Sequence, residues 1–110
     1  MKIRDIVEEL NLEVCCGAEG LDKEVEGGYA SDLLSDVMGN SQEGQIWVTL
    51  QTHKNIMAIA SLKDLAAIVL VKGYMPDEDT KEQAESEGIP ILSTKEQAFE
   101  ITGKLYELIK

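Results

Sequence analysis

Six consecutive apolar residues, Ala66–Val71, constrain the fold of this chain more than any other feature of its sequence. The run has the length of a strand and is far shorter than the ~20 residues that span a bilayer. A strand that is apolar on both faces has to be covered on both faces, as in the parallel sheets of α/β proteins. We therefore predict that residues 66–71 form the central strand of a mainly parallel sheet that is packed against helices.

The rest of the chain alternates between strand-like and helix-like patterns. Alternating or β-rich patterns predict strands at residues 11–16, 23–30, 45–50 and 89–92. The glycine pair in the second of these predicts a bulge or a close approach of the backbone to a neighbour. Pro90 favours an edge position for the last strand, or at least a place where a strand begins.

Helices are predicted between these strands. Helical periodicity or capping residues mark segments 3–10, 32–38 behind a Ser31–Asp32 cap, 55–65, Pro76 to Gly88, and the C-terminal segment behind a Ser93–Thr94 cap. In the last helix, Phe99, Thr102, Tyr106 and Ile109 fall on one stripe. Strands that alternate with helices through short connections predict one α/β domain over residues 1–110, with right-handed crossovers.

The charge of the chain excludes two classes of partner. It has 21 acidic against 10 basic side chains, a net charge of −11. Such a chain repels phosphate backbones and anionic lipids, so neither nucleic-acid nor membrane binding is expected. Residues 77–87 alone hold six carboxylates against the single Lys81. This segment is predicted to be a solvated helix face, and it could dock a basic protein partner.

Compartment and cofactors follow from what the sequence lacks. The N-terminal segment is too short and too acidic in its apolar part for a secretory signal, so a cytoplasmic location is expected. The two cysteines, Cys15 and Cys16, are neighbours and cannot join distant segments. With one histidine, His53, and no C-x-x-C spacing, no metal site and no cofactor are expected.

Polar residues gather where three predicted strands lead into helices. Ligands in open α/β sheets bind at the carboxyl ends of strands. The loop from Thr49 to Asn55 is the strongest candidate, because glutamine and histidine are not preferred caps, whereas Ser31, Asp32 and Thr94 are also ordinary capping residues. The predicted ligand-binding residues are Gly27, Gly28, Tyr29, Ser31, Asp32, Thr49, Gln51, Thr52, His53, Asn55 and Thr94.

The motifs of several enzyme classes are missing. Gly27-Gly28 has neither the G-x-x-x-x-G-K-[ST] phosphate loop nor the dinucleotide fingerprint, and no Ser-His-Asp or Cys-His arrangement can be assigned. We therefore expect a non-catalytic protein. Catalysis by His53 together with Asp32 or Thr52 is a minor alternative.

Several stretches resemble the DRTGG domain family. Residues 24–39 and 47–53 carry most of the resemblance, and Ala67–Val71 and Glu87–Thr94 are similar to the family's later strand and its last strand-to-helix junction. Where the family name spells Asp-Arg-Thr-Gly-Gly, this chain has Glu-Val-Glu-Gly-Gly at residues 24–28, so only the glycines match. A weaker similarity points to the N-terminal domain of HPr kinase, which is also a non-catalytic α/β module.

The resemblance implies a regulatory or ligand-sensing module rather than a catalyst. Family members occur as free-standing proteins, beside CBS domains, or within phosphotransacetylase-like chains. We accordingly expect a module that binds a small molecule at the strand carboxyl ends or a protein partner, and that self-associates as a homodimer. An assembly module without any small ligand is the alternative. The acidic residues at the glycine loop favour the Gln51–His53 junction, or a protein partner, over an anion at that loop.

Overall fold

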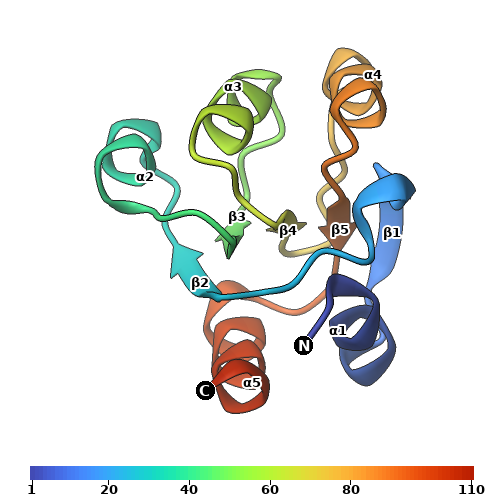
Figure 1. Ribbon diagram of the computed structural model, residues 1–110, viewed down its shortest axis with the longest axis vertical. Helices are drawn as coiled ribbons and strands as arrows, with labels where there is room; N and C mark the ends of the chain where they lie inside the picture. Colours follow the sequence, from blue (N-terminus) through green and yellow to red (C-terminus); the bar gives the residue numbers. More distant parts are fainter.

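One five-stranded sheet organises the computed structural model, which describes residues 1–110 (Figure 1). The strands lie in the order β1-β5-β4-β3-β2. All neighbours among β2 to β5 pair in parallel, and only β1 is antiparallel to its neighbour β5. The mainly parallel α/β fold is thus confirmed, with the apolar run in the middle strand. The strands are β1 (Glu13–Cys16), β2 (Gly27–Ala30), β3 (Gln45–Thr49), β4 (Ala67–Leu70) and β5 (Ile91–Ser93).

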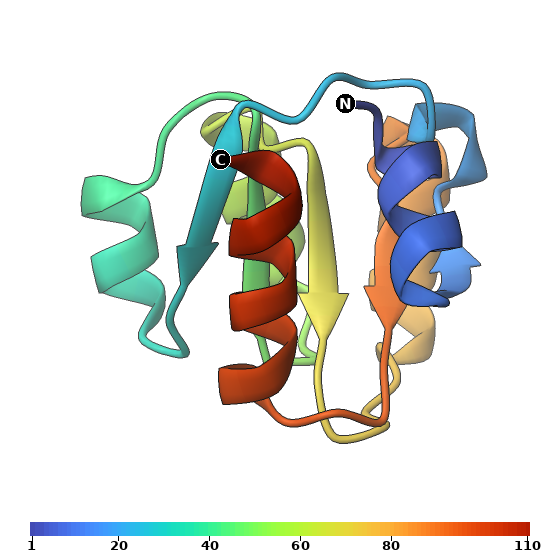
Figure 2. The same ribbon diagram turned by 90° about the horizontal axis from the view of Figure 1, so that it is seen from below.

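Helices cover both faces of this sheet. On one face lie α2 (Leu34–Asn40), α3 (Asn55–Leu62) and α4 (Glu78–Glu87), and on the other lie α1 (Ile3–Leu10) and α5 (Ala98–Ile109) (Figures 1 and 2). A single 3-10 turn, η1 (Ala18–Gly20), follows β1. Successive parallel connections that advance in one direction along a sheet place their helices on the same face, which explains why α2, α3 and α4 lie together. None of the five helices combines the length and apolar content that a bilayer crossing requires.

The alternation of side chains along β3 and β4 builds one core on each face. Ile46 and Val48 face the layer of α1 and α5, whereas Trp47 faces the layer of α2, α3 and α4. In β4, Val69 contributes to the first core and Ile68 to the second, and all four residues of the strand are fully buried. Fully burying side chains of this size stabilises the fold by about 1.5–3 kcal/mol each.

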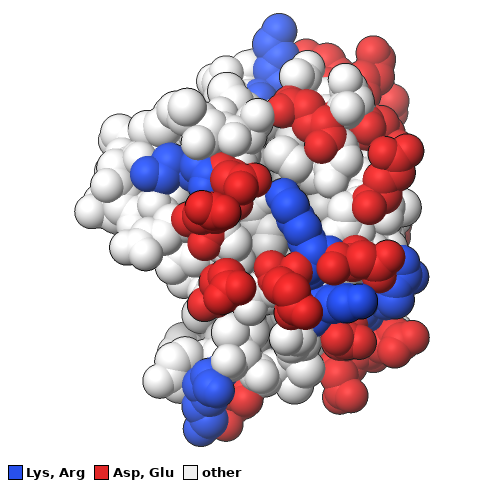
Figure 3. Space-filling view, viewed as in Figure 1, with Lys and Arg blue, Asp and Glu red and all other residues white.

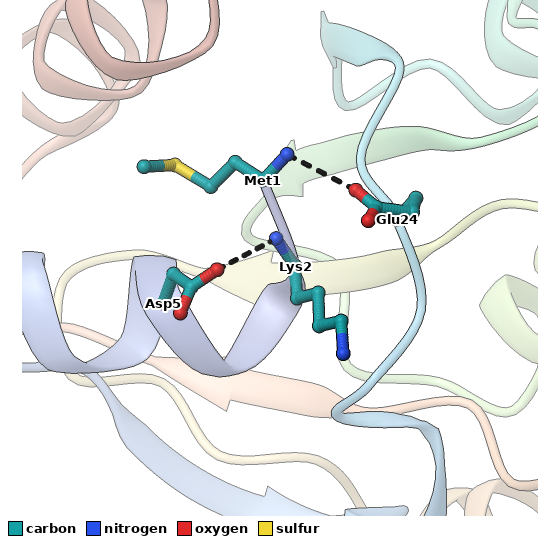
Figure 4. A network of polar contacts seen from close by, with 4 residues as sticks. All are labelled: Met1, Lys2, Asp5 and Glu24. Carbon is teal, nitrogen blue, oxygen red and sulfur yellow. Dashed lines mark hydrogen bonds and ion pairs between the residues drawn. The ribbon is translucent and has the colours of Figure 1, made fainter.

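The N-terminal segment is bound to the backbone and side chain of Glu24 (Figure 4). Lys2 forms an isolated antiparallel bridge with Glu24, and the Met1 amino group lies 3.0 Å from the Glu24 carboxylate. The Lys2 N–H donates to Asp5 Oδ2 at 3.0 Å, which satisfies one free donor at the start of α1. Both termini lie at the amino ends of the parallel strands, away from the edge where ligands are expected (Figure 2).

The edge position expected for the strand after Pro90 is wrong. The strand β5 lies inside the sheet, between β1 and β4. Pro90 directly precedes it, and its carbonyl accepts a hydrogen bond from the Ile68 N–H. The other expectation, that Pro90 marks the start of a strand, is therefore confirmed, because a proline in that place costs the ladder no donor.

The predicted start of the last helix is also wrong. The helix α5 begins at Ala98 behind Gln97, not behind Ser93 and Thr94. Ser93 is buried in β5, where its hydroxyl donates to the Tyr74 carbonyl at 3.0 Å. Thr94 Oγ1 instead accepts from the Glu96 N–H in the loop.

The expected apolar stripe of the same helix does not pack on the sheet as a whole. Phe99 and Tyr106 are 87% and 66% exposed, whereas Ile101 and Leu105 on the opposite side are buried. The helix carries two apolar stripes, and the sheet covers the one made of branched aliphatic residues.

The region around β2 and the bounds of α2 and α3 differ from the prediction. Only Gly27–Ala30 form the strand, and the glycine pair is in regular register with β3, with ordinary contact distances of 3.6 Å or more for an added Cβ. The one irregular register lies in β1, between Val14 and Cys16. Helix α2 begins two residues later than expected, because Asp32 bonds elsewhere and does not cap it. Helix α3 ends at Leu62 rather than at residue 65.

Candidate functional site

The first two predicted junctions, after β2 and after β3, are joined through Asp32. Its Oδ1 accepts hydrogen bonds from Thr49 Oγ1 at 2.8 Å and from the Leu50 N–H at 2.9 Å. Gln51 Nε2 donates to the Asp32 carbonyl at 2.9 Å, so the side chain of Gln51 also holds the two loops together. The structure thus brings Asp32, Thr49 and Gln51 into one cluster, whose polar groups bind one another.

The neighbouring predicted residues also make local bonds. Ser31 Oγ accepts from the Leu33 N–H, and the Ser31 carbonyl accepts from Trp47 Nε1 at 2.9 Å. The Thr52 carbonyl accepts from the buried Thr80 hydroxyl at 2.9 Å, which ties the loop to α4. These bonds hold the loops against the helices that follow them.

His53 lies exposed at the start of α3. Its Nδ1 accepts a hydrogen bond from the Asn55 N–H at 3.1 Å, so the ring caps the first turn of the helix. No hydrogen bond joins His53 to Asp32 or to the side chain of Thr52. The orienting contact that base catalysis by His53 would need is therefore not formed.

The side chain of Tyr29 links β2 to α2 through a hydrogen bond. Its hydroxyl donates to Asp36 Oδ2 at 2.9 Å. This hydrogen bond, helped by Ser31 and Asn40, lowers the pKa of Asp36, and the same bond raises the pKa of Tyr29. A carboxyl whose pKa is depressed on folding stabilises the fold above its unfolded pKa, and the contribution is lost as the pH falls through the folded value.

The third junction opens into a cavity of about 730 Å³ at the carboxyl end of β5, which we call the rim cavity. Lys72 and Gly73 both adopt the left-handed conformation, with φ of 59° and 76°, so the chain leaving β4 turns back sharply. The Gly73 N–H donates to the Thr94 carbonyl and the Lys72 N–H to the Glu96 carbonyl, at 2.8 and 2.9 Å. The lining residues are Glu9, Leu10, Asn11, Glu13, Gly73, Met75, Ser93, Thr94, Lys95, Glu96 and Lys104.

Charges of both signs surround the rim cavity. Lys104 Nζ pairs with Glu96 at 2.9 Å, whereas exposed Lys95 takes part in no ion pair. Glu9 and Glu13 add carboxylates on the side of α1 and β1. The volume falls within the 300–1,000 Å³ typical of small-molecule sites. The arrangement can bind a small polar molecule through an ammonium group, carboxylates and a threonine hydroxyl.

A second cavity of about 330 Å³, the edge cavity, lies between β2 and α5. The predicted residues Gly27, Gly28 and Tyr29 line it, across from Thr102 and Tyr106. Thr102 Oγ1 is buried without a hydrogen-bond partner. None of the four main cavities is lined by a residue of the loop from Thr49 to Asn55.

The cysteines of β1 have little nucleophilic character. Burial, helped by the charge of Glu13, raises the pKa of Cys15 to about 11, and burial also raises that of Cys16. The Cys15 thiol lies 3.8 Å from the sulfur of Met75. A thiol with such a pKa is almost entirely protonated at neutral pH. No group of three or more His, Cys, Asp and Glu side chains is arranged to hold a metal ion.

Of the predicted residues, Thr94 alone lines the rim cavity. Its other walls come from the segment that joins α1 to β1, from the loop after β4 and from α5, three regions that are far apart in the sequence. Glu9, Glu13 and Lys104 look like ordinary surface residues in their own segments, so no local signal identifies them. Lys95 directly follows the pair Ser93–Thr94, so its position in the sequence does indicate a place at this junction.

Comparison with known proteins gives one family and one fold. The family model of the DRTGG domain matches residues 5–108. No curated protein matches the chain. Among solved structures, the chain is similar to the regulatory region of Clostridium perfringens pyrophosphatase, which comprises CBS and DRTGG domains and was solved with its activator, diadenosine tetraphosphate. The TM-score is 0.69 at 16% identity, over 96% of this chain and 45% of that one, so this chain spans less than half of that regulatory region.

Proposed function

The chain belongs to the DRTGG domain family, and on that premise we propose that it is a non-catalytic regulatory module that senses a small polar molecule. The ligand binds at the carboxyl ends of the parallel strands, in the rim cavity. We place this activity in the cytoplasm, where free thiols such as Cys15 and Cys16 stay reduced.

The single observation that supports this site is the contrast between the three junctions at the carboxyl ends of the parallel strands. At the first two, Asp32, Thr49 and Gln51 satisfy one another. At the third, an open polar cavity of about 730 Å³ remains, at the place where α/β sheets bind ligands.

In this proposal Lys95 and Thr94 are the principal ligand contacts. Lys95 offers an ammonium group that no carboxylate of the chain engages, and Thr94 lies beside it at the end of β5. The loop with Gln51 and His53 is the second candidate on this rim, and there a ligand would have to displace existing hydrogen bonds.

Thermal unfolding in the presence of candidate ligands tests the proposal. The probes are diadenosine tetraphosphate, ATP, AMP and acetyl phosphate. A probe present at a hundredfold excess over its dissociation constant should stabilise the protein by ~2.7 kcal/mol. Lys95→Ala should lower the affinity, whereas Lys63→Ala, at the far end of α3, should leave it unchanged.

The outcomes separate the two candidate sites. An affinity that falls in Gln51→Ala or His53→Ala, but not in Lys95→Ala, would move the site to the second junction. If none of the four probes shifts the unfolding temperature of the wild-type protein, the proposal is wrong for nucleotides and acyl phosphates.

We further propose that the chain self-associates as a homodimer. A second candidate function follows from this, namely a protein assembly module that binds no small ligand. The observation that favours it is the exposure of Phe99 and Tyr106 on α5. A small domain gains further apolar burial by pairing with a second copy. Sedimentation velocity across a range of concentrations tests this directly.

A further inference from the structure

The outer side of α5 carries an apolar stripe that nothing in the chain covers. Phe99 and Tyr106 are 87% and 66% exposed. Gly103 lies between them on the helix, four residues after Phe99 and three residues before Tyr106. Residues at these spacings share one face of a helix. We call Phe99, Gly103 and Tyr106 the outer stripe.

No packing contact within the chain requires a glycine at position 103. A glycine inside a helix costs about 1 kcal/mol relative to alanine. A Cβ at this position would meet no atom within 4 Å, so neither the sheet nor a neighbouring helix requires the space. A missing side chain on the outside of a helix does allow a second helix to approach its backbone closely.

The charges around the outer stripe balance, unlike those of the rest of the molecule. Residues 98–110 hold Glu100 and Glu107 against Lys104 and Lys110, so the whole net charge of −11 lies elsewhere. Figure 3 shows acidic side chains gathered towards the right-hand side and over α4, whereas basic and acidic side chains lie next to each other at the C-terminal end of α5, which this view sees end-on. Two copies of so acidic a chain repel each other over most of their surface, and this stripe is where they can meet.

We infer that the outer stripe of α5 is the contact surface of a two-fold symmetric homodimer, in which two antiparallel α5 helices cross at Gly103 and Phe99 of each copy packs on Tyr106 of the other. This inference rests on the self-association proposed above and names its surface. In a two-fold interface the same patch serves both copies, so it has to be self-complementary. An aromatic residue on either side of a small one meets that condition, and an aromatic pair contributes about 0.5–1.5 kcal/mol beyond area burial.

The apolar area that the outer stripe can bury determines how stable the proposed dimer is. The exposed parts of the two aromatic side chains supply about 300 Å², compared with roughly 800 Å² per partner in a stable interface. The rest must come from the flanks of the stripe, where Ala30 and Thr102 line a shallow apolar groove beside the open edge of β2. We therefore expect a dimer that dissociates at micromolar concentrations.

Sedimentation velocity from 1 to 200 µM provides the first test. The wild-type protein should shift from monomer to dimer, and Phe99→Glu and Tyr106→Glu should remain monomeric, because each places two additional carboxylates in the interface. Both side chains are exposed, so circular dichroism should show an unchanged fold. Leu62→Glu is the matched control, since Leu62 is 70% exposed on α3 at the other face of the sheet and its variant should dimerise like wild type.

Cross-linking through Gly103→Cys provides the second test. At a two-fold crossing the two introduced thiols lie together, so at 200 µM protein mild oxidation with copper phenanthroline should trap the dimer as a disulfide on a non-reducing gel, even though the added side chain weakens the non-covalent contact. The wild-type protein, with only Cys15 and Cys16, should give none.

The results distinguish failure of the surface from failure of self-association. A wild-type protein that stays monomeric throughout overturns both. A wild-type dimer that persists in the glutamate variants, with no cross-link at position 103, overturns the surface and leaves self-association standing. Neither result bears on ligand binding in the rim cavity.

Discussion

Helices α4 and α5 lie on opposite faces of the same sheet and are of similar length, but they are held by different forces. Helix α4 buries only Thr80 and Ala84, and all five of its carboxylates are exposed. Helix α5 buries Ile101 and Leu105 and exposes aromatic side chains on its other side. In the proposed dimer, the first surface keeps copies of the molecule apart and the second is the one through which they meet.

The attachment of α4 is largely polar. The Thr80 hydroxyl and the Asp77 N–H both donate to the Thr52 carbonyl, and Glu85 accepts from the Gly17 N–H at 2.8 Å. The attachment of α5 is apolar, because Ile101 and Leu105 belong to the core formed with β3 and β4. Four experiments probe this difference, from the largest expected effect to the smallest.

Leu105→Ala should have the largest effect. It removes a buried side chain from the inner face of α5, and we expect a loss of about 2–5 kcal/mol in the free energy of unfolding. Phe99→Ala on the outer face should change the stability of the monomer by less than about 0.5 kcal/mol. Urea denaturation at low micromolar protein measures both. Similar losses in the two variants would show that the outer face is not free in the monomer.

Thr80→Val tests the polar attachment of α4. The substitution keeps the shape and removes a fully buried donor, and we expect a loss of about 1–2 kcal/mol in the free energy of unfolding. Thr102→Val on α5 is the matched control. The buried Oγ1 of Thr102 has no partner, so this variant should be neutral or slightly more stable. Equal losses from both substitutions would contradict the role assigned to the Thr80 hydroxyl.

Gly103→Ala should raise the stability of the monomer and weaken the dimer. In the monomeric Phe99→Glu background it should stabilise the protein by about 1 kcal/mol, because alanine is the better helix former. In the wild-type background the added methyl group should weaken dimerisation, as followed by sedimentation velocity. A dimer that tightens instead would argue against a close crossing at this residue.

Neutralising α4 should have the smallest effect. The double substitution Glu78→Gln and Glu82→Gln removes two exposed charges, and we expect a change of less than about 0.5 kcal/mol in unfolding free energy. It should slightly strengthen dimerisation at low salt, and the gain should disappear at 0.3 M NaCl, where the Debye length is below 8 Å. A loss of dimer in this variant would place α4 in the interface.

The candidate site was predictable only in part. Polar residues after β2 and β3 can be read from the sequence, and the structure does bring Asp32, Thr49 and Gln51 together. Whether such residues bind a ligand or one another depends on which donors meet which acceptors, and local patterns do not encode this. The rim cavity has walls from α1, β1, β5 and α5, so its residues become neighbours only through folding.

The two helix starts that were predicted wrongly, those of α2 and α5, share one cause. The pair of Ser93 and Thr94 has the residue types of a helix cap, but the buried Ser93 hydroxyl bonds to the Tyr74 carbonyl. Asp32 likewise bonds to the neighbouring loop instead of capping α2. A capping side chain is a small contribution of about 1 kcal/mol, and a tertiary partner for the same oxygen readily replaces it.

The sequence by itself determined the α/β class, the order of the elements and the central place of the apolar run at residues 66–71, because the period and burial of side chains follow directly from residue type. It also determined that the chain is strongly acidic. Only the tertiary structure decided that β5 lies inside the sheet, that α5 packs through Ile101 and Leu105, and that Phe99 and Tyr106 face outward. A helix with two apolar stripes can bury either of them, and the shape of the sheet surface selects which one.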